Sequence, residues 1–269
     1  MPTYLQKEKS IIDLLKTAEE VIWKNQKHTI ILVDKPIYGS GEGKTDIYCR
    51  LDNGEEIKIS YKMKTADFLE NKIKKERAQA LFGNDWQQII INAIMNIKDR
   101  FIAKPVYYDT KKGNVEAGSY TMGWRIDIVD KPARNKQSLT TELQLTQQQK
   151  LEILGGINLS EDKKNCVVGN TKIPNSGVAN YILIEQDFKN AQDILNNLID
   201  IADYNIPMYL SFRAVNYRSK TNAMDGNRSL GVYVKWMQND YLLIFDHPLE
   251  LGAKDVLAQF KKERMLDNK

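Results

Sequence analysis

Apolar positions along the 269-residue chain fall into helix-like and strand-like stretches that alternate from end to end. Between residues 7 and 25 they recur every three to four positions, the spacing of a helix that buries one face. "TIILV" (29–33), "DIYCRL" (46–51) and "EEIKISYK" (55–62) are instead rich in β-branched and aromatic residues, as strands are. The pattern therefore predicts a helix followed by three strands.

The rest of the chain continues this alternation. Helices are expected at 66–80, 85–101, 140–154, 188–204 and 253–265. Strands are expected at 104–110, 119–130, 179–186, 206–218, 229–237 and 240–245, and a polar loop at 157–178. This pattern predicts an α/β protein with a mixed central β-sheet flanked by helices. Residues 1–156 are expected to form the core. Residues 157–269 complete the same domain or form a specificity or dimerisation subdomain.

Composition limits the classes of function. The chain is 42% hydrophobic and 28% charged, with a net charge of +4, which suits a globular protein and allows a polyanionic partner. No run of 18 apolar residues and no signal peptide is found, so neither a membrane span nor export is expected. Two widely spaced cysteines, Cys49 and Cys166, fit the cytoplasm. Only His28 and His247 are present, which argues against histidine-cluster mechanisms.

Gly43-Lys44-Thr45 matches the end of a phosphate-binding loop. The pattern requires a glycine five residues earlier, where this chain has Tyr38, and a helix directly afterwards, where this chain predicts a strand. A nucleotide-binding protein that uses residues 39–45 is therefore a minor hypothesis.

The hairpin at 46–62 carries the more informative chemistry. If Asn53-Gly54 forms a two-residue turn, Asp46 lies opposite Tyr61, with Ser60 adjacent. Side chains alternate between the two faces of a strand, so the following four residues share one face: Glu56, Lys58, Ser60 and Lys62. A carboxylate at one strand start and a lysine on the next strand can hold a divalent metal beside a charge-stabilising group.

The stretch "KTDIYCRLDNGEEIKISYK" (44–62) resembles the PD-(D/E)XK nuclease superfamily, which has the restriction-endonuclease-like fold. In that pattern an Asp opens the second strand, and an acid-x-Lys motif follows on the third. With its flanking helices and strand, the resemblance covers roughly residues 7–100. Thr45 stands where many members of the superfamily have proline.

Two positions for the acid-x-Lys motif are open. Glu56-x-Lys58 matches the residue types of the motif, but Glu56 would lie on the order of 16 Å from Asp46 along the strands. Ser60-x-Lys62 fits the geometry and is similar to restriction enzymes whose acid comes from the next helix. Glu76, 14 residues after Lys62, would then supply that acid, with Glu70 as the nearer competitor.

The resemblance implies catalytic roles for Asp46, Ser60, Lys62 and Glu76. Asp46 and Glu76 would hold Mg²⁺. Some members of the superfamily add a first-helix glutamate, here Glu20 or Glu19.

The implied activity is Mg²⁺-dependent hydrolysis of double-stranded DNA, sequence-specific as in type II restriction, by a homodimer. Basic residues near the hairpin and in the segment 213–228 are candidate DNA contacts: Lys64, Lys72, Lys75, Arg77, Arg213, Arg218, Lys220 and Arg228. Because Ser60 stands where an acid is usual, the alternative is a DNA-binding protein on a nuclease scaffold. It would be non-catalytic, or directed to DNA structures or ends as in phage DNA processing.

Overall fold

The chain divides into two compact units in a computed structural model that describes residues 3–39, 43–64, 68–132 and 138–264. The first unit comprises Met1–Ala66 and Leu145–Asn205, and the second comprises Asp67–Gln144 and Ile206–Lys269. This division differs from the expected boundary between residues 156 and 157. The reason is that residues 181–184 pair with the strand at 59–62, which joins the segment 145–205 to the N-terminal strands.

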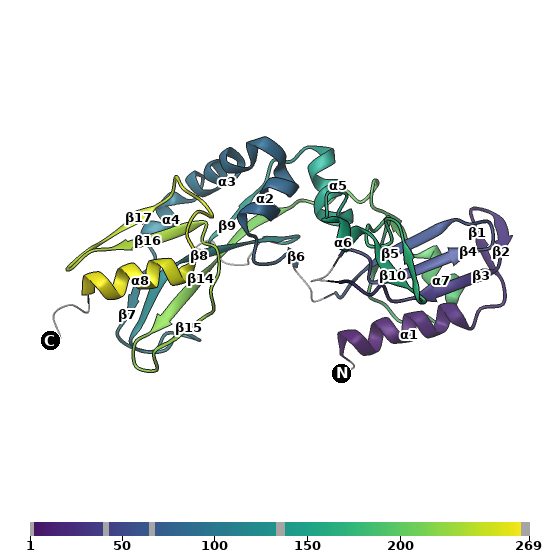
Figure 1. The fold of residues 1–269 in the computed structure, drawn as a ribbon, viewed down its shortest axis with the longest axis horizontal. Coiled ribbons are helices and arrows are strands. Elements are labelled where there is room, and N and C mark those ends of the chain that lie inside the picture. Colours follow the sequence, from purple (N-terminus) through teal and green to yellow (C-terminus); the bar gives the residue numbers. More distant parts are fainter. Residues whose placement is uncertain (1–2, 40–42, 65–67, 133–137, 265–269) are drawn as a thin grey trace. The chain divides into compact units, whose positions relative to one another are not determined.

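The first unit is built around one mixed sheet (Figure 1). Its elements in chain order are α1 (Tyr4–Lys16), β1 (Val21–Trp23), β2 (Gln26–His28), β3 (Ile30–Asp34), β4 (Ile47–Leu51), β5 (Glu56–Lys62), α5 (Gln147–Gly155), α6 (Glu161–Lys164), β10 (Cys166–Val168), β11 (Thr171–Ile173), β12 (Tyr181–Ile184), α7 (Ala191–Asn196) and β13 (Ile199–Asp200). The sheet has the order β13-β12-β5-β4-β3. Strand β12 runs parallel to β5, and the other neighbours are antiparallel. The α/β class and a mixed sheet are therefore confirmed.

Alternation along β4 and β5 gives this sheet two different faces. Ile47, Cys49, Ile57 and Ile59 are fully buried on the face that packs against α1 and α7. Tyr48 points to the opposite face, where the β10-β11 hairpin covers it. The strands that carry the predicted site are thus fixed from both sides.

The hairpin between β4 and β5 is wider than expected. Three residues, Asp52–Gly54, connect Leu51 to Glu55, and Gly54 adopts a φ of 85°. That conformation is typical of a three-residue hairpin loop, not of the expected two-residue turn. Strand pairing follows Ile47↔Ile59, so Asp46 continues the ladder opposite Ser60 and not opposite Tyr61. A one-residue change of register exchanges the faces, and it places Asp46 on the same face as Lys62.

The second unit is dominated by an antiparallel sheet. Its elements are β6 (Phe68–Glu70), α2 (Lys75–Phe82), the 3-10 turn η1 (Gly83–Asp85), α3 (Trp86–Met95), α4 (Lys98–Ile102), β7 (Tyr107–Tyr108), β8 (Ser119–Val129), β9 (Thr140–Glu142), β14 (Tyr209–Arg218), β15 (Ala223–Met224), β16 (Val232–Trp236), β17 (Tyr241–Ile244) and α8 (Ala253–Arg264). The strand order is β15-β14-β8-β16-β17, with β6 and β7 also paired to β8, and β9 to β14.

Aromatic side chains form the core of the second unit. Phe101 of α4 makes edge-to-face contacts with Trp124 of β8 and Phe212 of β14, with ring centroids 5.2 and 5.1 Å apart. Phe260 packs α8 onto Tyr120 and Trp236, at 4.7 and 5.3 Å. These contacts pack α4 and α8 onto the sheet of the second unit.

Several expected elements are wrong in type or length. The helix expected over 7–25 ends at Lys16, and the helix expected over 66–80 begins only at Lys75, after the strand β6. The helix expected over 140–154 splits into β9 and α5, and the helix expected over 188–204 shortens to α7. The expected loop at 157–178 contains α6 and the β10-β11 hairpin. None of the helices in the described residues combines the length and apolar character needed to cross a membrane.

Candidate active site

Asp46 is fixed where the chain enters β4. Its N–H donates to the carbonyl of Ile59 at 2.8 Å, and its Oδ2 accepts from the N–H of Tyr61 at 2.8 Å. Just before it, the N–H groups of Lys44 and Thr45 both donate to the carbonyl of Gly177. Asp46 is therefore bound to β5 twice, through its own N–H and through its carboxylate, where β4 and β5 meet.

Burial raises the pKa of Asp46 to about 6. The positive charge of Lys62 and the Tyr61 N–H oppose this shift, and the nearby carboxylate of Glu8 adds to it. A carboxylate that is costly to ionise can gain strongly from a bound cation. Ordinary surface aspartates do not have this property.

Glu8 of α1 supplies a second carboxylate close to Asp46. Its side chain is only 2% exposed, and it pairs through Oε2 with Lys35. Its other oxygen, Oε1, is buried without a hydrogen-bond partner among the described residues. The Tyr4 hydroxyl interacts with both carboxylates, and burial and these two acids raise the pKa of Tyr4 far above its usual range. Buried polar atoms normally have a hydrogen-bond partner, so Oε1 has lone pairs that a ligand could use.

Lys62 lies at the end of β5, two positions beyond the residue opposite Asp46. Such diagonal neighbours are about 7–8 Å apart between strands, within reach of a lysine side chain. Its carbonyl accepts from the N–H of Glu185 at 2.7 Å, and Glu185 in turn accepts from the N–H of Lys64 at 2.9 Å. Glu185 therefore fixes the chain on both sides of Met63.

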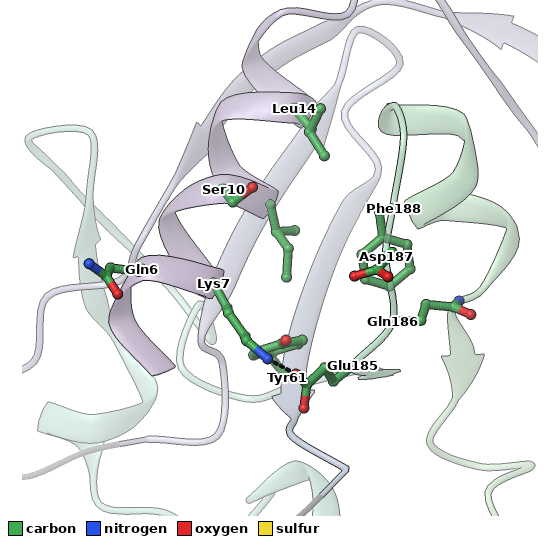
Figure 2. Close-up of a pocket in the computed structure, with 10 residues that line it drawn as sticks. Gln6, Lys7, Ser10, Leu14, Tyr61, Glu185, Gln186, Asp187 and Phe188 are labelled. Carbon is green, nitrogen blue, oxygen red and sulfur yellow. Dashed lines mark ion pairs between the residues drawn. The ribbon is translucent and has the colours of Figure 1, made fainter. Parts of the chain in front are cut away.

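A cleft of ≈ 300 Å³ opens beside this strand end, between α1 and the segment that follows β12 (Figure 2). Lys7 and Glu185 form an ion pair across it, next to Tyr61. Ile11, Leu14 and Phe188 supply its apolar walls. The ion pair ties α1, and with it Glu8, to the β5-β12 strand pair.

The alternative motif residues Glu56 and Lys58 are engaged elsewhere. Glu56 accepts from the Tyr48 hydroxyl at 2.5 Å and from Arg50 at 3.0 Å, and Lys58 lies 3.8 Å from its other oxygen. Glu56 is four positions from the residue opposite Asp46, which corresponds to roughly 13 Å along the strand. This distance leaves Ser60-x-Lys62 as the motif beside Asp46.

The predicted helix-borne acids lie in the second unit. Glu76 occupies the first turn of α2, and Glu70 ends β6 and pairs with Arg77. Glu19 and Glu20 were expected on the first helix, which is wrong because α1 ends at Lys16. Glu20 is exposed and pairs with Lys27 at 2.8 Å.

The predicted DNA contacts fall into two groups. Lys64 belongs to the first unit and is exposed. The others belong to the second unit: Lys72, Lys75, Arg77, Arg213, Arg218, Lys220 and Arg228. Within this group Arg218 is neutralised by Asp225 at 2.5 Å, whereas Arg213 is exposed in the middle of β14.

Sequence reasoning missed Tyr4, Glu8 and Glu152. Glu8 stands out only after the helix phase is known, because its neighbours Ile11, Ile12 and Leu15 are buried with it. Glu152 is the one acid of α5, is 1% exposed, and accepts from the N–H of Asn158. That bond gives Glu152 a role in ending α5 and leaves Glu8 as the better partner for Asp46.

Groups of three or more metal-binding side chains do not occur in the described part of the chain. Mg²⁺ does not require one, since it commonly binds one or two carboxylates and retains its water ligands. The unpaired Glu8 Oε1 and the half-buried Asp46 carboxylate are hard oxygen donors of the kind that this ion prefers. The donor set of the first unit thus fits a magnesium ion.

No family model, no curated protein and no solved structure matches this chain. The site must therefore be interpreted from its own geometry.

Proposed function

We propose that the protein is a Mg²⁺-dependent DNA endonuclease of the PD-(D/E)XK type that hydrolyses phosphodiester bonds in double-stranded DNA. The observation that carries the proposal is the meeting of Asp46, Lys62 and Glu8 at one edge of a mixed sheet, with the Asp46 pKa raised to about 6. Sequence-specific cutting as a homodimer, as in type II restriction, is the form of this activity that we expect.

The topology of the first unit supports this interpretation. After α1 and the β1-β2 hairpin come three antiparallel strands, β3, β4 and β5, and the last of them pairs in parallel with β12. Asp46 directly precedes β4, the middle of these three strands, and Lys62 is the last residue of β5. This is the arrangement that the hairpin motif of the nuclease superfamily leads one to expect, with Ser60 in place of the strand acid.

Asp46 and Glu8 are the residues that would hold Mg²⁺. When bound, the ion would polarise a phosphoryl oxygen and lower the pKa of a bound water. Lys35 pairs with Glu8 in its buried position, and Tyr61 orients Asp46 through its backbone N–H. Both carboxylates are thus positioned before substrate arrives.

Lys62 would stabilise the negative charge that develops on the phosphate as the bond breaks. A preorganised cation in a partly dehydrated site is worth roughly 10²–10³ in rate, by analogy with other charge-stabilising groups. Its strand end is fixed by Glu185, and Glu185 is fixed by Lys7. Glu185 is therefore a positioning residue, and only Lys62 would touch the substrate.

The test is cleavage of supercoiled plasmid and of mixed genomic DNA, with Mg²⁺ and with EDTA. Lys62→Ala should reduce cleavage about 10²–10³-fold and Asp46→Ala should abolish it, without loss of DNA binding in EDTA. Lys58→Ala is the matched control, because it removes a lysine from the same face of the same strand. Discrete fragments would establish sequence specificity, and a smear would indicate a nonspecific or structure-directed enzyme.

The proposal fails if wild-type protein cuts no form of DNA, or if Asp46→Ala cuts as the wild type does. Salt-sensitive binding without cleavage would identify the non-catalytic DNA-binding alternative. Loss of activity in Lys58→Ala but not in Lys62→Ala would move the motif to Glu56-x-Lys58.

A second set of variants assigns the remaining acid. Glu8→Gln should raise the Mg²⁺ concentration that gives half-maximal cleavage at least tenfold, because it removes one of two anionic ligands. Glu70→Gln, Glu76→Gln and Glu152→Gln are controls with the same change of charge. A loss of cleavage confined to Glu76→Gln or Glu70→Gln would instead identify the acid expected from the sequence as the second ligand.

A further inference from the structure

The long antiparallel strands of the second unit carry a polar face of unusual charge. Trp124, Ile126 and Phe212 lie on the buried face of β8 and β14. On the opposite face, alternation places Arg125 and Asp127 on β8 and Arg213 on β14. Antiparallel sheets commonly leave one face open to solvent or a partner, and Arg213 is exposed on this face.

Arg125 and Arg213 are directly opposite each other in the strand register. Like charges in directly opposite positions destabilise a sheet. Asp127 lies between them, fully buried, with its Oδ2 at 3.4 Å from Arg125 Nε and 3.5 Å from Arg213 Nε. One carboxylate offsets one of the two guanidinium charges, and the second positive charge remains.

The same aspartate anchors a third basic residue. Its Oδ1 accepts from the N–H of Lys72 at 2.7 Å, and Lys72 adopts a φ of 57°, a left-handed conformation that costs energy for a residue other than glycine. The lysine side chain is exposed. Asp127 therefore holds three basic residues around itself, and the site has an excess of two positive charges.

The arginine side chains are partly ordered before any ligand binds. The Arg213 guanidinium stacks on Phe68 at 4.3 Å, and 47% of its side chain is exposed. Arg125 Nε is buried without a hydrogen-bond partner among the described residues. Stacked and anchored guanidinium groups lose little side-chain entropy when they bind phosphate.

We propose that Lys72, Arg125 and Arg213, here called the basic face, bind the phosphate backbone of duplex DNA. This inference rests on the proposed function for the identity of the polyanion. Phosphate groups would offset the excess charge, and guanidinium groups match their geometry with two parallel hydrogen bonds. Contacts of this kind fix the position of the duplex and carry no sequence information. Glu142 of β9, beside Tyr209, lies farther along the same face and limits its basic part to the three named residues.

The experiment measures binding of a fluorescent duplex of about 30 base pairs in EDTA at several salt concentrations. Arg213→Ala should weaken binding on the order of tenfold and reduce the salt slope, d log K/d log[salt], by about 0.9, the value for one lost phosphate contact. Arg213→Lys should keep the slope, because it keeps the charge. Lys235→Ala removes an exposed charge from β16 of the same unit and is the matched control.

Wild-type affinity and salt slope in both Arg213→Ala and Lys72→Ala would overturn the inference, as would a wild-type protein that does not bind DNA. Thermal unfolding confirms that each variant is folded. Failure of the proposed function is a separate outcome, because Asp46→Ala tests cleavage and should bind DNA as the wild type does. A protein that binds through Arg213 but never cuts would support the basic face and contradict the nuclease.

Discussion

Replacing Asp46 with asparagine should stabilise the first unit at neutral pH. The pKa of Asp46 is raised from 3.8 to about 6, so the folded unit binds a proton more tightly than the unfolded chain does. Stability therefore falls as pH rises from about 4 to 6, because ionisation of the desolvated carboxylate disfavours the folded state. The difference between these two pKa values corresponds to about 3 kcal/mol, at about 1.36 kcal/mol for each pKa unit.

An asparagine at this position would keep the oxygen that accepts from the Tyr61 N–H and would carry no charge to desolvate. We expect Asp46→Asn to raise the free energy of unfolding by up to about 3 kcal/mol at pH 7.5 and by about zero at pH 4. The attraction of Lys62 for the ionised carboxylate is already included in the figure of about 3 kcal/mol, because it opposes the rise in the Asp46 pKa.

The measurement is amide hydrogen exchange of peptides from β4 and β5 in increasing urea, which reports on this unit alone. Asp13→Asn, on the exposed side of α1, is the control with the same change of charge and should have little effect at either pH. Destabilisation by Asp46→Asn at pH 7.5, or an equal gain at pH 4 and pH 7.5, would refute the reasoning. If Asp46→Asn is more stable than the wild type but no longer cleaves DNA, the Asp46 carboxylate lowers stability and is needed for activity.

Three further predictions concern the first unit. Mg²⁺ affinity, measured by calorimetry, should fall about tenfold for each pH unit below about 6, since the ion binds only ionised Asp46, and a flat profile would contradict this. Cys49, whose pKa burial raises to about 12, and buried Cys166 should both resist a thiol reagent until urea unfolds the chain, and rapid labelling in buffer would show an error in the core. Gly177→Ala should lower the free energy of unfolding by roughly 1–3 kcal/mol, because a Cβ there would lie 1.8 Å from the carbonyl oxygen of Lys163. It should also reduce cleavage, because the Gly177 carbonyl anchors the segment before Asp46. An unchanged melting temperature would argue against this close approach.

Local sequence patterns are sufficient to predict the hairpin that carries the candidate site. The β-branched residues of β4 and β5 and the Asn53-Gly54 pair predict two strands and a turn, and both strands are confirmed. The expected register is wrong by one residue, because the sequence does not distinguish a two-residue from a three-residue loop around the same glycine. That single residue decides whether Asp46 faces the core or faces Lys62.

Non-local pairing explains the elements that the sequence does not predict. Residues 68–70 lie in a lysine-rich stretch with helical spacing, yet they form β6 because they pair with β8. Thr140–Glu142 likewise forms a strand on β14, although a Gln-rich helix follows directly. Partners more than 50 residues away override local preference, which is weak for short segments.

The path of the chain between β5 and β12 explains why sequence spacing points to an acid in the second unit. Parallel strands require a crossover, and a count of residues after Lys62 assumes that the crossover helix follows at once. Here the chain enters the second unit after residue 66 and returns only at residue 145, so the helices of the first unit that precede β12 are α5 and α6. A count of 14 residues therefore reaches Glu76 in the second unit, while α1 already supplies Glu8 next to Asp46. Spacing rules along a sequence hold only where the connection they assume is uninterrupted. The strand register and the burial of Glu8 are therefore the stronger evidence for which carboxylates act together.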